Sequence, residues 1–206
     1  LGSHCGYTKT ITIDGTNDFS ATLEKFDALD GYSAYATWDA TNLYLAMEGP
    51  DVGLSNAQKW WQVYIGGADG TTNGVTYKST AGDPQQSTLP FSAKYHYRWK
   101  TDGLYTNKMF WDHTLATPAW VDGGDVPVAN WKRTGSFVEM LIPLADIGSP
   151  TSLQIHMTML NETDDGEWTW APFPSTSFTP AKDPDYTKFY EFNLKGPVAP
   201  AAYALP

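Results

Sequence analysis

The chain has 206 residues, a formal net charge of −10 at pH 7, a pI near 4.6 and a single cysteine, Cys5. The acidity argues against nucleic acid and anionic membrane surfaces as partners, because both need a basic face. One cysteine excludes an internal disulfide, and no apolar stretch is long enough to span a membrane as a helix.

Short alternating segments separated by turn residues follow one another along the whole chain. The first runs to Ile13 and ends at Asp14-Gly15, which is a turn signal. Two more are joined by a tight turn at 39–42, which predicts a hairpin. The complete set of predicted strands, in chain order, is 8–13, 33–38, 43–48, 59–65, 75–77, 91–100, 108–113, 137–143, 153–160 and 187–193.

Helical periodicity is missing, because apolar residues at i, i+3, i+4 and i+7 do not persist beyond about two turns. Roughly ten short strands with turn punctuation predict an all-β protein, an antiparallel β-sandwich of the immunoglobulin or jelly-roll type. We expect residues 1–206 to form one domain, with an irregular Pro/Ala-rich tail over 196–206. The abundance of Asn, Thr, Gly and aromatic residues, with little Lys, favours export to the cell surface or medium, and we expect a monomer.

The order of the segments resembles the family 9 carbohydrate-binding modules and the DOMON-type domains that share their sandwich. The matching pieces cover most of the chain: 13–15, 36–39 with 42–45, 60–65, 95–99, 138–139 with 142–143, and 154–160. Such folds host sugar, haem and metal sites, so this resemblance implies the fold and leaves the ligand open.

A narrower resemblance lies in Trp111-Asp112-His113. This run is similar to the Trp-x-His of the surface copper-binding proteins of methane-oxidising bacteria, the MopE/CorA group. In that group the tryptophan is oxidised to kynurenine and joins two histidines at a mononuclear copper(I) site. The resemblance therefore implies an extracellular protein for copper capture or storage, associated with the outer membrane, with Trp111 and His113 at the site.

The second histidine has two candidates. Residues two apart on a strand share a face, so Trp111 and His113 project together. If the segments 91–100 and 108–113 form a hairpin, His96 faces them when it lies opposite residue 111 or 113. In the copper-binding group the second histidine follows the Trp-x-His, which favours His156. Both His96 and His156 therefore stay in the predicted metal site.

Weaker signals complete the set. Asp14-Gly15-Thr16-Asn17-Asp18 gathers oxygen ligands that would suit calcium, although the spacing is also that of an Asx-turn, and the acidic run 161–167 has the same two interpretations. Nucleophile elbows, zinc-protease helices, phosphate loops and dinucleotide fingerprints are all missing, so we expect no enzyme activity. The alternative functions are a carbohydrate-binding module and a haem domain. Sugar stacking would use tryptophans, and haem ligation would use His156 with a neighbouring methionine; the residues concerned are Trp60, Trp61, Trp168, Trp170, Met157 and Met159.

Overall fold

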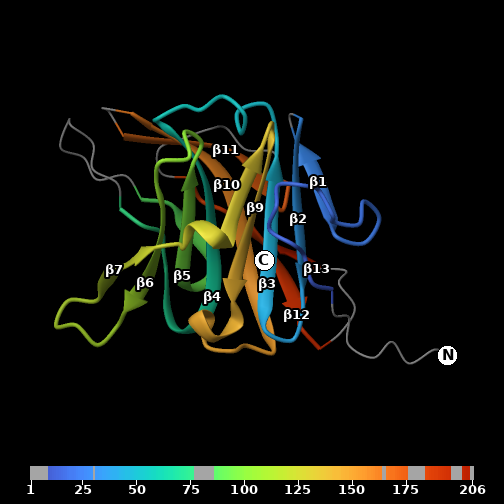
Figure 1. The fold of residues 1–206 in the computed structure, drawn as a ribbon. Coiled ribbons are helices and arrows are strands. Elements are labelled where there is room, and N and C mark those ends of the chain that lie inside the picture. The colour runs from blue at the N-terminus through green and yellow to red at the C-terminus, as the bar shows by residue number, and fades with distance from the viewer. Residues whose placement is uncertain are drawn as a thin grey trace.

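The computed structural model describes residues 9–29, 31–76, 86–163, 166–175, 184–195 and 201–204. Within them nearly all regular structure is β, arranged as two antiparallel sheets packed face to face (Figure 1). The predicted all-β sandwich is therefore confirmed. The strands are β1 Lys25–Leu29, β2 Tyr32–Trp38, β3 Asn42–Glu48, β4 Lys59–Asn73, β5 Thr88–Lys100, β6 Thr106–Asp112, β7 Ala119–Asp125, β8 Trp131–Thr134, β9 Phe137–Pro143, β10 Ser152–Thr163, β11 Gly166–Phe173, β12 Lys188–Asn193 and β13 Ala201–Ala204.

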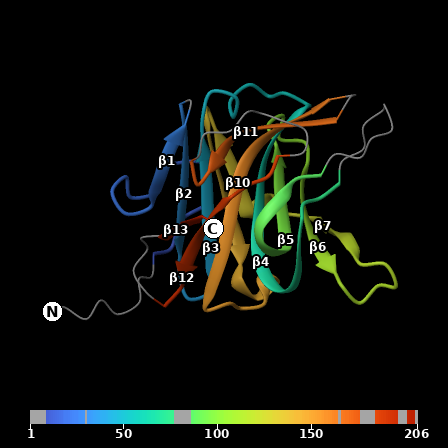
Figure 2. The same cartoon turned by 180° about the vertical axis from the view of Figure 1, so that it is seen from behind.

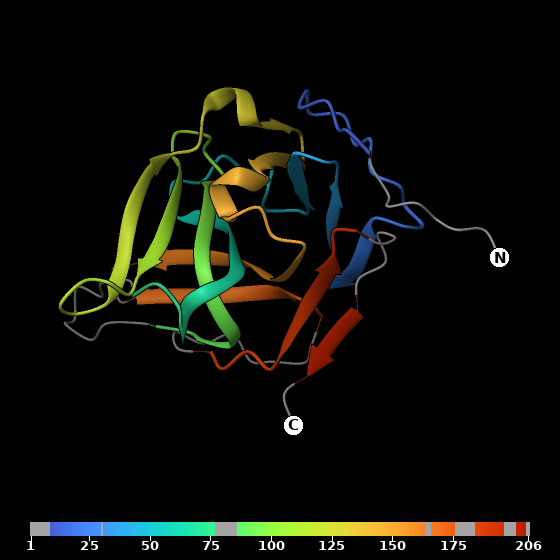
Figure 3. The ribbon, with the colours of Figure 1, turned by 90° about the horizontal axis from the view of Figure 1, so that it is seen from below.

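The two sheets differ in size. The smaller has five strands in the order β1-β2-β3-β9-β8, and the larger has eight, in the order β13-β12-β10-β4-β5-β6-β7 with β11 paired to β10. Seen from below, the β6–β7 hairpin lies at one edge of the larger sheet and the β12–β13 pair at the other (Figure 3). Two short 3-10 turns, η1 (Val128–Asn130) and η2 (Leu144–Ile147), flank β8 and β9.

Apolar side chains form three clusters because both sheets are covered on their outer faces as well as packed together. The main core lies between the sheets and includes Trp38, Trp61 and Trp99, all almost fully buried. A second cluster covers the outer face of the smaller sheet, where Ile11 and Phe19 pack from the segment before β1. This double coverage explains why every residue of β2 is buried, including Ser33 and Thr37 on its outer face.

The third cluster covers the outer face of the larger sheet and positions the candidate site. Its members come from β4, β5, β10 and β12 and from the segments around residues 75 and 186. They are Trp60, Tyr64, Val75, Leu89, Phe91, Ala93, Leu160, Tyr186 and Phe189, with Met109 and Trp120 packed at the margin. The polar side chains of Gln62, His96 and His156 on this outer face are therefore removed from water, contrary to the usual solvated face of an antiparallel sheet.

Three sequence predictions differ from the structure. The predicted strand 75–77 is not formed at its described residues, because Val75 and Thr76 belong to no strand, and residue 77 lies outside the described part. Residues 9–13 form no strand; Ile11 instead packs against the outer face of the smaller sheet, and its alternation reflects this one-sided burial. Inside the segment expected to be an irregular tail, Ala201–Ala204 forms β13, which pairs with β12 and covers its edge. The rest of the tail, residues 196–200 and 205–206, lies outside the described residues.

Candidate metal centre

One cross-strand row holds both buried histidines. His156 on β10 is opposite Tyr64 on β4, Tyr64 is opposite His96 on β5, and His96 is opposite Met109 on β6. Figure 2 shows these strands side by side. Directly opposed residues in a sheet share a face, so the four side chains all project toward the outer cluster. His96 and His156 are two strands apart, about 10 Å between backbones, with Tyr64 between them.

His96 is completely buried. Its Nδ1 lies 3.1 Å from the carbonyl oxygen of Val63, and its ring stacks on Tyr64 with centroids 4.3 Å apart. Burial, and secondarily the charge of Arg98, hold the pKa of His96 well below its ordinary value, against the opposing hydrogen bond to Val63. Because a carbonyl only accepts, Nδ1 carries the hydrogen and donates, which leaves the lone pair of the neutral ring on Nε2.

His156 has the same arrangement one strand beyond β4. Its Nδ1 lies 3.1 Å from the carbonyl oxygen of Lys188, and its ring packs against Tyr186 at 4.1 Å between centroids. Burial lowers the pKa of His156 to about 4, against the hydrogen bond to Lys188, so the ring is neutral at pH 7. Its Nε2 is buried and has no hydrogen-bond partner within the described part of the chain.

Trp111 reaches this row through a tryptophan that sequence inspection did not single out. Trp111 lies directly opposite Trp120 on β7, and their ring centroids are 5.9 Å apart. Trp120 in turn lies 6.2 Å from the His96 ring and 6.0 Å from the Tyr64 ring, and its Nε1 donates to the carbonyl of Asn73. Trp120 therefore fills the space between Trp111 and His96. The signal was hidden because β7, rich in Gly and Asp, was not predicted as a strand.

His113 lies apart from the buried histidines. The predicted hairpin of β5 and β6 is confirmed, but His96 is opposite Met109 and not opposite residue 111 or 113. His113 is four residues beyond Met109, which is about 14 Å along the chain at the spacing of a β-strand. There it is half exposed, with Nδ1 3.4 Å from Lys94 Nζ and Nε2 3.9 Å from an Asp69 carboxylate oxygen.

The four predicted metal residues are thus brought together only in part. His96 and His156 share the row, Trp111 is joined to His96 through Trp120, and His113 stands at the rim. Among the described residues, no three His, Cys, Asp or Glu side chains are grouped so that they could hold one ion. A site built from the described residues of this face would therefore have fewer than three imidazole or carboxylate donors.

The acidic loop at 14–18 is an Asx-turn. Asp14 Oδ1 accepts the Thr16 N–H at 2.7 Å, which lowers the pKa of Asp14. The backbone N–H groups of Asp14 and Gly15 donate to Glu139 Oε1 at 2.8 and 2.6 Å. The loop is therefore held against β9 by a carboxylate, while calcium binding there stays a prediction. The second acidic loop is the β10–β11 hairpin, whose residues 164 and 165 lie outside the described part.

The tryptophans proposed for sugar stacking are mostly inaccessible. Trp60 and Trp61 point to opposite faces, as predicted, but both are buried, with exposed fractions of 3% and 1%. Trp170 is partly buried and donates its Nε1 hydrogen to the Tyr32 hydroxyl, whereas the Trp168 side chain lies outside the described part. Met157 lies in the main core on the face opposite His156, so the haem alternative gains no ligand from it.

Within the described residues, no helix has both the length and the apolar character needed to cross a bilayer. Comparison of the chain with protein-family models, with curated proteins and with solved structures finds no match in any of the three.

Proposed function

We propose that this protein binds copper(I) on the outer face of its larger sheet and serves to capture or store copper outside the cell. The buried row of His96 and His156 supplies the imidazole donors, with the Trp111 region beside it. The protein acts as a binding protein and not as an enzyme.

The observation that carries the proposal is the shared state of the two histidines. Each donates Nδ1–H to a backbone carbonyl at 3.1 Å, and burial lowers the pKa of each, so both rings are neutral at pH 7. Histidines that ligate metals use one ring nitrogen for the metal and orient the ring by donating from the other. The buried Nε2 of His156, which lacks a hydrogen-bond partner among the described residues, is the atom that such a role would occupy.

The donor set suits copper better than the hard cations. Imidazole binds copper readily, whereas calcium and magnesium need several oxygen ligands. The apolar cluster around the row excludes water, which favours a soft, singly charged ion over a strongly hydrated one. Copper, when bound, would supply redox chemistry beside the aromatic side chains of the row.

The resemblance of Trp111-Asp112-His113 to the copper-binding group extends the proposal to Trp111. Dioxygen opens the indole ring to N-formylkynurenine, and water then removes the formyl group as formate to leave kynurenine. The partly buried Trp111 ring packs on Trp120, which contacts His96, so an oxidation that begins at the row has an aromatic neighbour to act on.

Copper retention tests the proposal. The protein is incubated with copper(I) under anaerobic, reducing conditions, desalted, and assayed for bound metal by mass spectrometry. We expect wild type and His113→Gln to retain copper, whereas His96→Gln and His156→Gln lose most of it. No retained copper in wild type would contradict the function. Loss in His113→Gln alone would contradict the placement of the site in the buried row. Peptide mapping of protein from the native host tests the modification of Trp111.

A further inference from the structure

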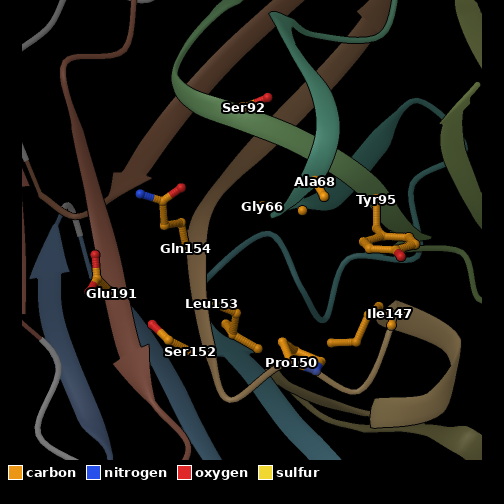
Figure 4. Close-up of a pocket in the computed structure, with 12 residues that line it drawn as sticks. Gly66, Ala68, Ser92, Tyr95, Ile147, Pro150, Ser152, Leu153, Gln154 and Glu191 are labelled. Atoms are coloured by element: carbon orange, nitrogen blue, oxygen red, sulfur yellow. The ribbon is translucent and has the colours of Figure 1, made fainter. Parts of the chain in front are cut away.

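A hollow of about 490 Å³ opens at one end of the sandwich, and neither buried histidine lines it. It exists because β4 pairs with β10 only as far as Ile65, and the β4–β5 register then breaks at Gly66. Figure 4 shows the hollow between the Gly66–Ala68 segment of β4, residues Ser152–Gln154 of β10 and the loop after η2. A Cβ on Gly67 would lie 2.6 Å from the Lys94 Cβ, so this close passage of β4 over β5 depends on glycine.

One wall of the hollow carries polar side chains that make no hydrogen bond with other described residues. Gln154 and Glu191 are directly opposed on β10 and β12, and Ser92 and Ser152 add two hydroxyls. None of these four side chains makes a hydrogen bond with another residue of the described part of the chain. Among the described residues, no lysine or arginine lines the hollow, so the described lining offers an amide, a carboxylate and hydroxyls without a positive charge.

The opposite wall is aromatic and leads into a second hollow. Tyr95 lines both spaces, and the second, of about 260 Å³, also exposes Phe110. Tyr95 and Phe110 are directly opposed on β5 and β6 and so share a face. Tyr95 packs against the main core behind it, whereas Phe110 is 36% exposed. Lys108, the one cation among the described residues that line either hollow, is paired with Asp146 at 2.9 Å.

We propose that these two hollows form one groove that binds a neutral oligosaccharide, with sugar rings stacked on Tyr95 and Phe110. Aromatic rings of this kind present apolar faces to the C–H side of a sugar, while Gln154, Glu191 and the two serines accept and donate to its hydroxyls. The lack of a free cation, together with the acidic net charge, selects against anionic glycans. Met109 is the one residue of the row that lines the groove, and neither His96 nor His156 lines it, so the groove proposal does not depend on the copper proposal.

Calorimetry with uncharged cello-, xylo-, manno- and chito-oligosaccharides tests the groove, with oligogalacturonate as the anionic comparison. We expect at least one neutral ligand to bind, and Phe110→Ala and Gln154→Ala each to weaken it about tenfold, which is the effect of about 1.4 kcal/mol. Tyr105→Ala removes a similarly exposed aromatic, 38% accessible, outside the groove and should bind like wild type. The His96→Gln, His156→Gln double variant should also bind like wild type.

Three results would overturn the groove proposal: no heat with any neutral glycan, wild-type affinity in both groove variants, or tighter binding of oligogalacturonate than of the neutral ligands. Circular dichroism of each variant confirms that the sandwich is intact. Phe110 is largely a surface residue and Gln154 lies in the groove wall, so neither truncation removes a core side chain. A copper result of either kind leaves this test unaffected.

Discussion

His156 and His96 flank Tyr64 in a single cross-strand row, each with Nδ1 3.1 Å from a backbone carbonyl. The outer-face cluster covers the row, so burial is the largest cause of the lowered pKa at both histidines. Both imidazoles are therefore neutral and held in one tautomer under an apolar cover. We expect this arrangement to make the stability of the protein depend on pH, as well as to favour metal binding.

The first prediction concerns acid stability. An unfolded histidine titrates near 6.5, whereas folded His156 titrates at about 4, so the unfolded state takes up the proton first as the pH falls. The stabilisation is complete above pH 6.5 and is lost between 6.5 and 4. We expect the protonation of His156 in the unfolded state to lower the unfolding free energy by about 2 kcal/mol between pH 7 and pH 5, because its pKa is 6.5 when unfolded and about 4 when folded.

Urea unfolding of apo protein at the two pH values measures this effect. His156→Gln should flatten the pH dependence, because glutamine keeps a polar group of similar size that does not titrate. His113→Gln, which removes a half-exposed ring, should leave the dependence at its wild-type value. Equal slopes in wild type and His156→Gln would show that His156 does not contribute to the acid limit.

The second prediction concerns the docking of the segment before β1. Glu139 Oε1 accepts the N–H groups of Asp14 and Gly15, and burial, the largest cause, raises the pKa of Glu139. Glu139→Ala leaves the N–H groups of Asp14 and Gly15 without this acceptor and should lower the unfolding free energy by about 2–3 kcal/mol. Glu139→Gln keeps an acceptor at the same position without the cost of a buried charge, so it should stay within about 1 kcal/mol of wild type. A destabilisation of Glu139→Gln as large as that of Glu139→Ala would contradict this account.

Much of the sandwich was predictable, because alternating apolar residues between turn residues indicate buried strands. The hairpin of β2 and β3 and the strands β5, β9 and β10 follow from that pattern. β7 and β8 were not predicted, because their residues are mostly polar or glycine. Their pairing depends on backbone hydrogen bonds rather than on an apolar face. The same limit hid Trp120, which no periodic pattern marked.

The candidate site was predictable only as a set of residues. The hairpin alone did not place His96 on the face of Trp111, because a register slip of one residue would put the two side chains on opposite faces. The register itself, with Met109 opposite His96, depends on the turn at 101–105 that joins β5 to β6. The row linking His96 to His156 required the strand order β10-β4-β5, which local sequence does not contain.

The third prediction contrasts two glycines with the same backbone requirement. Gly15 has φ +88° and Gly124 has φ +83°, so an alanine at either position adopts a left-handed conformation. That strain alone costs about 1–2 kcal/mol. A Cβ on Gly15 would also lie 2.1 Å from Thr134 Oγ1, whereas nothing lies within 4 Å of a Cβ on Gly124.

Chemical denaturation of the two variants gives the comparison. Gly124→Ala should lose about 1–2 kcal/mol, and Gly15→Ala should lose clearly more, because Thr134 must move and the docked segment with it. The double variant Gly15→Ala, Thr134→Ala removes the clashing hydroxyl and should recover part of the difference. If the single variants lost the same free energy, the close approach of Gly15 to β8 would not exist in solution.

The last prediction concerns Trp120, which lies over the His96 ring at 6.2 Å between centroids and covers it from the side of β7. Desolvation is the largest cause of the lowered pKa of His96, so Trp120→Ala, which admits water to the ring, should raise that pKa toward 6.5. The His156 ring lies two strands further away under Tyr186, and its pKa should stay near 4. Titration of the imidazole proton resonances by NMR separates the two histidines, and Leu115→Ala, at an exposed position in the β6–β7 loop, provides the control. A parallel rise at both histidines would indicate general loosening of the outer-face cluster, whereas an unchanged His96 would show that the cover over this ring comes from β4 and not from Trp120.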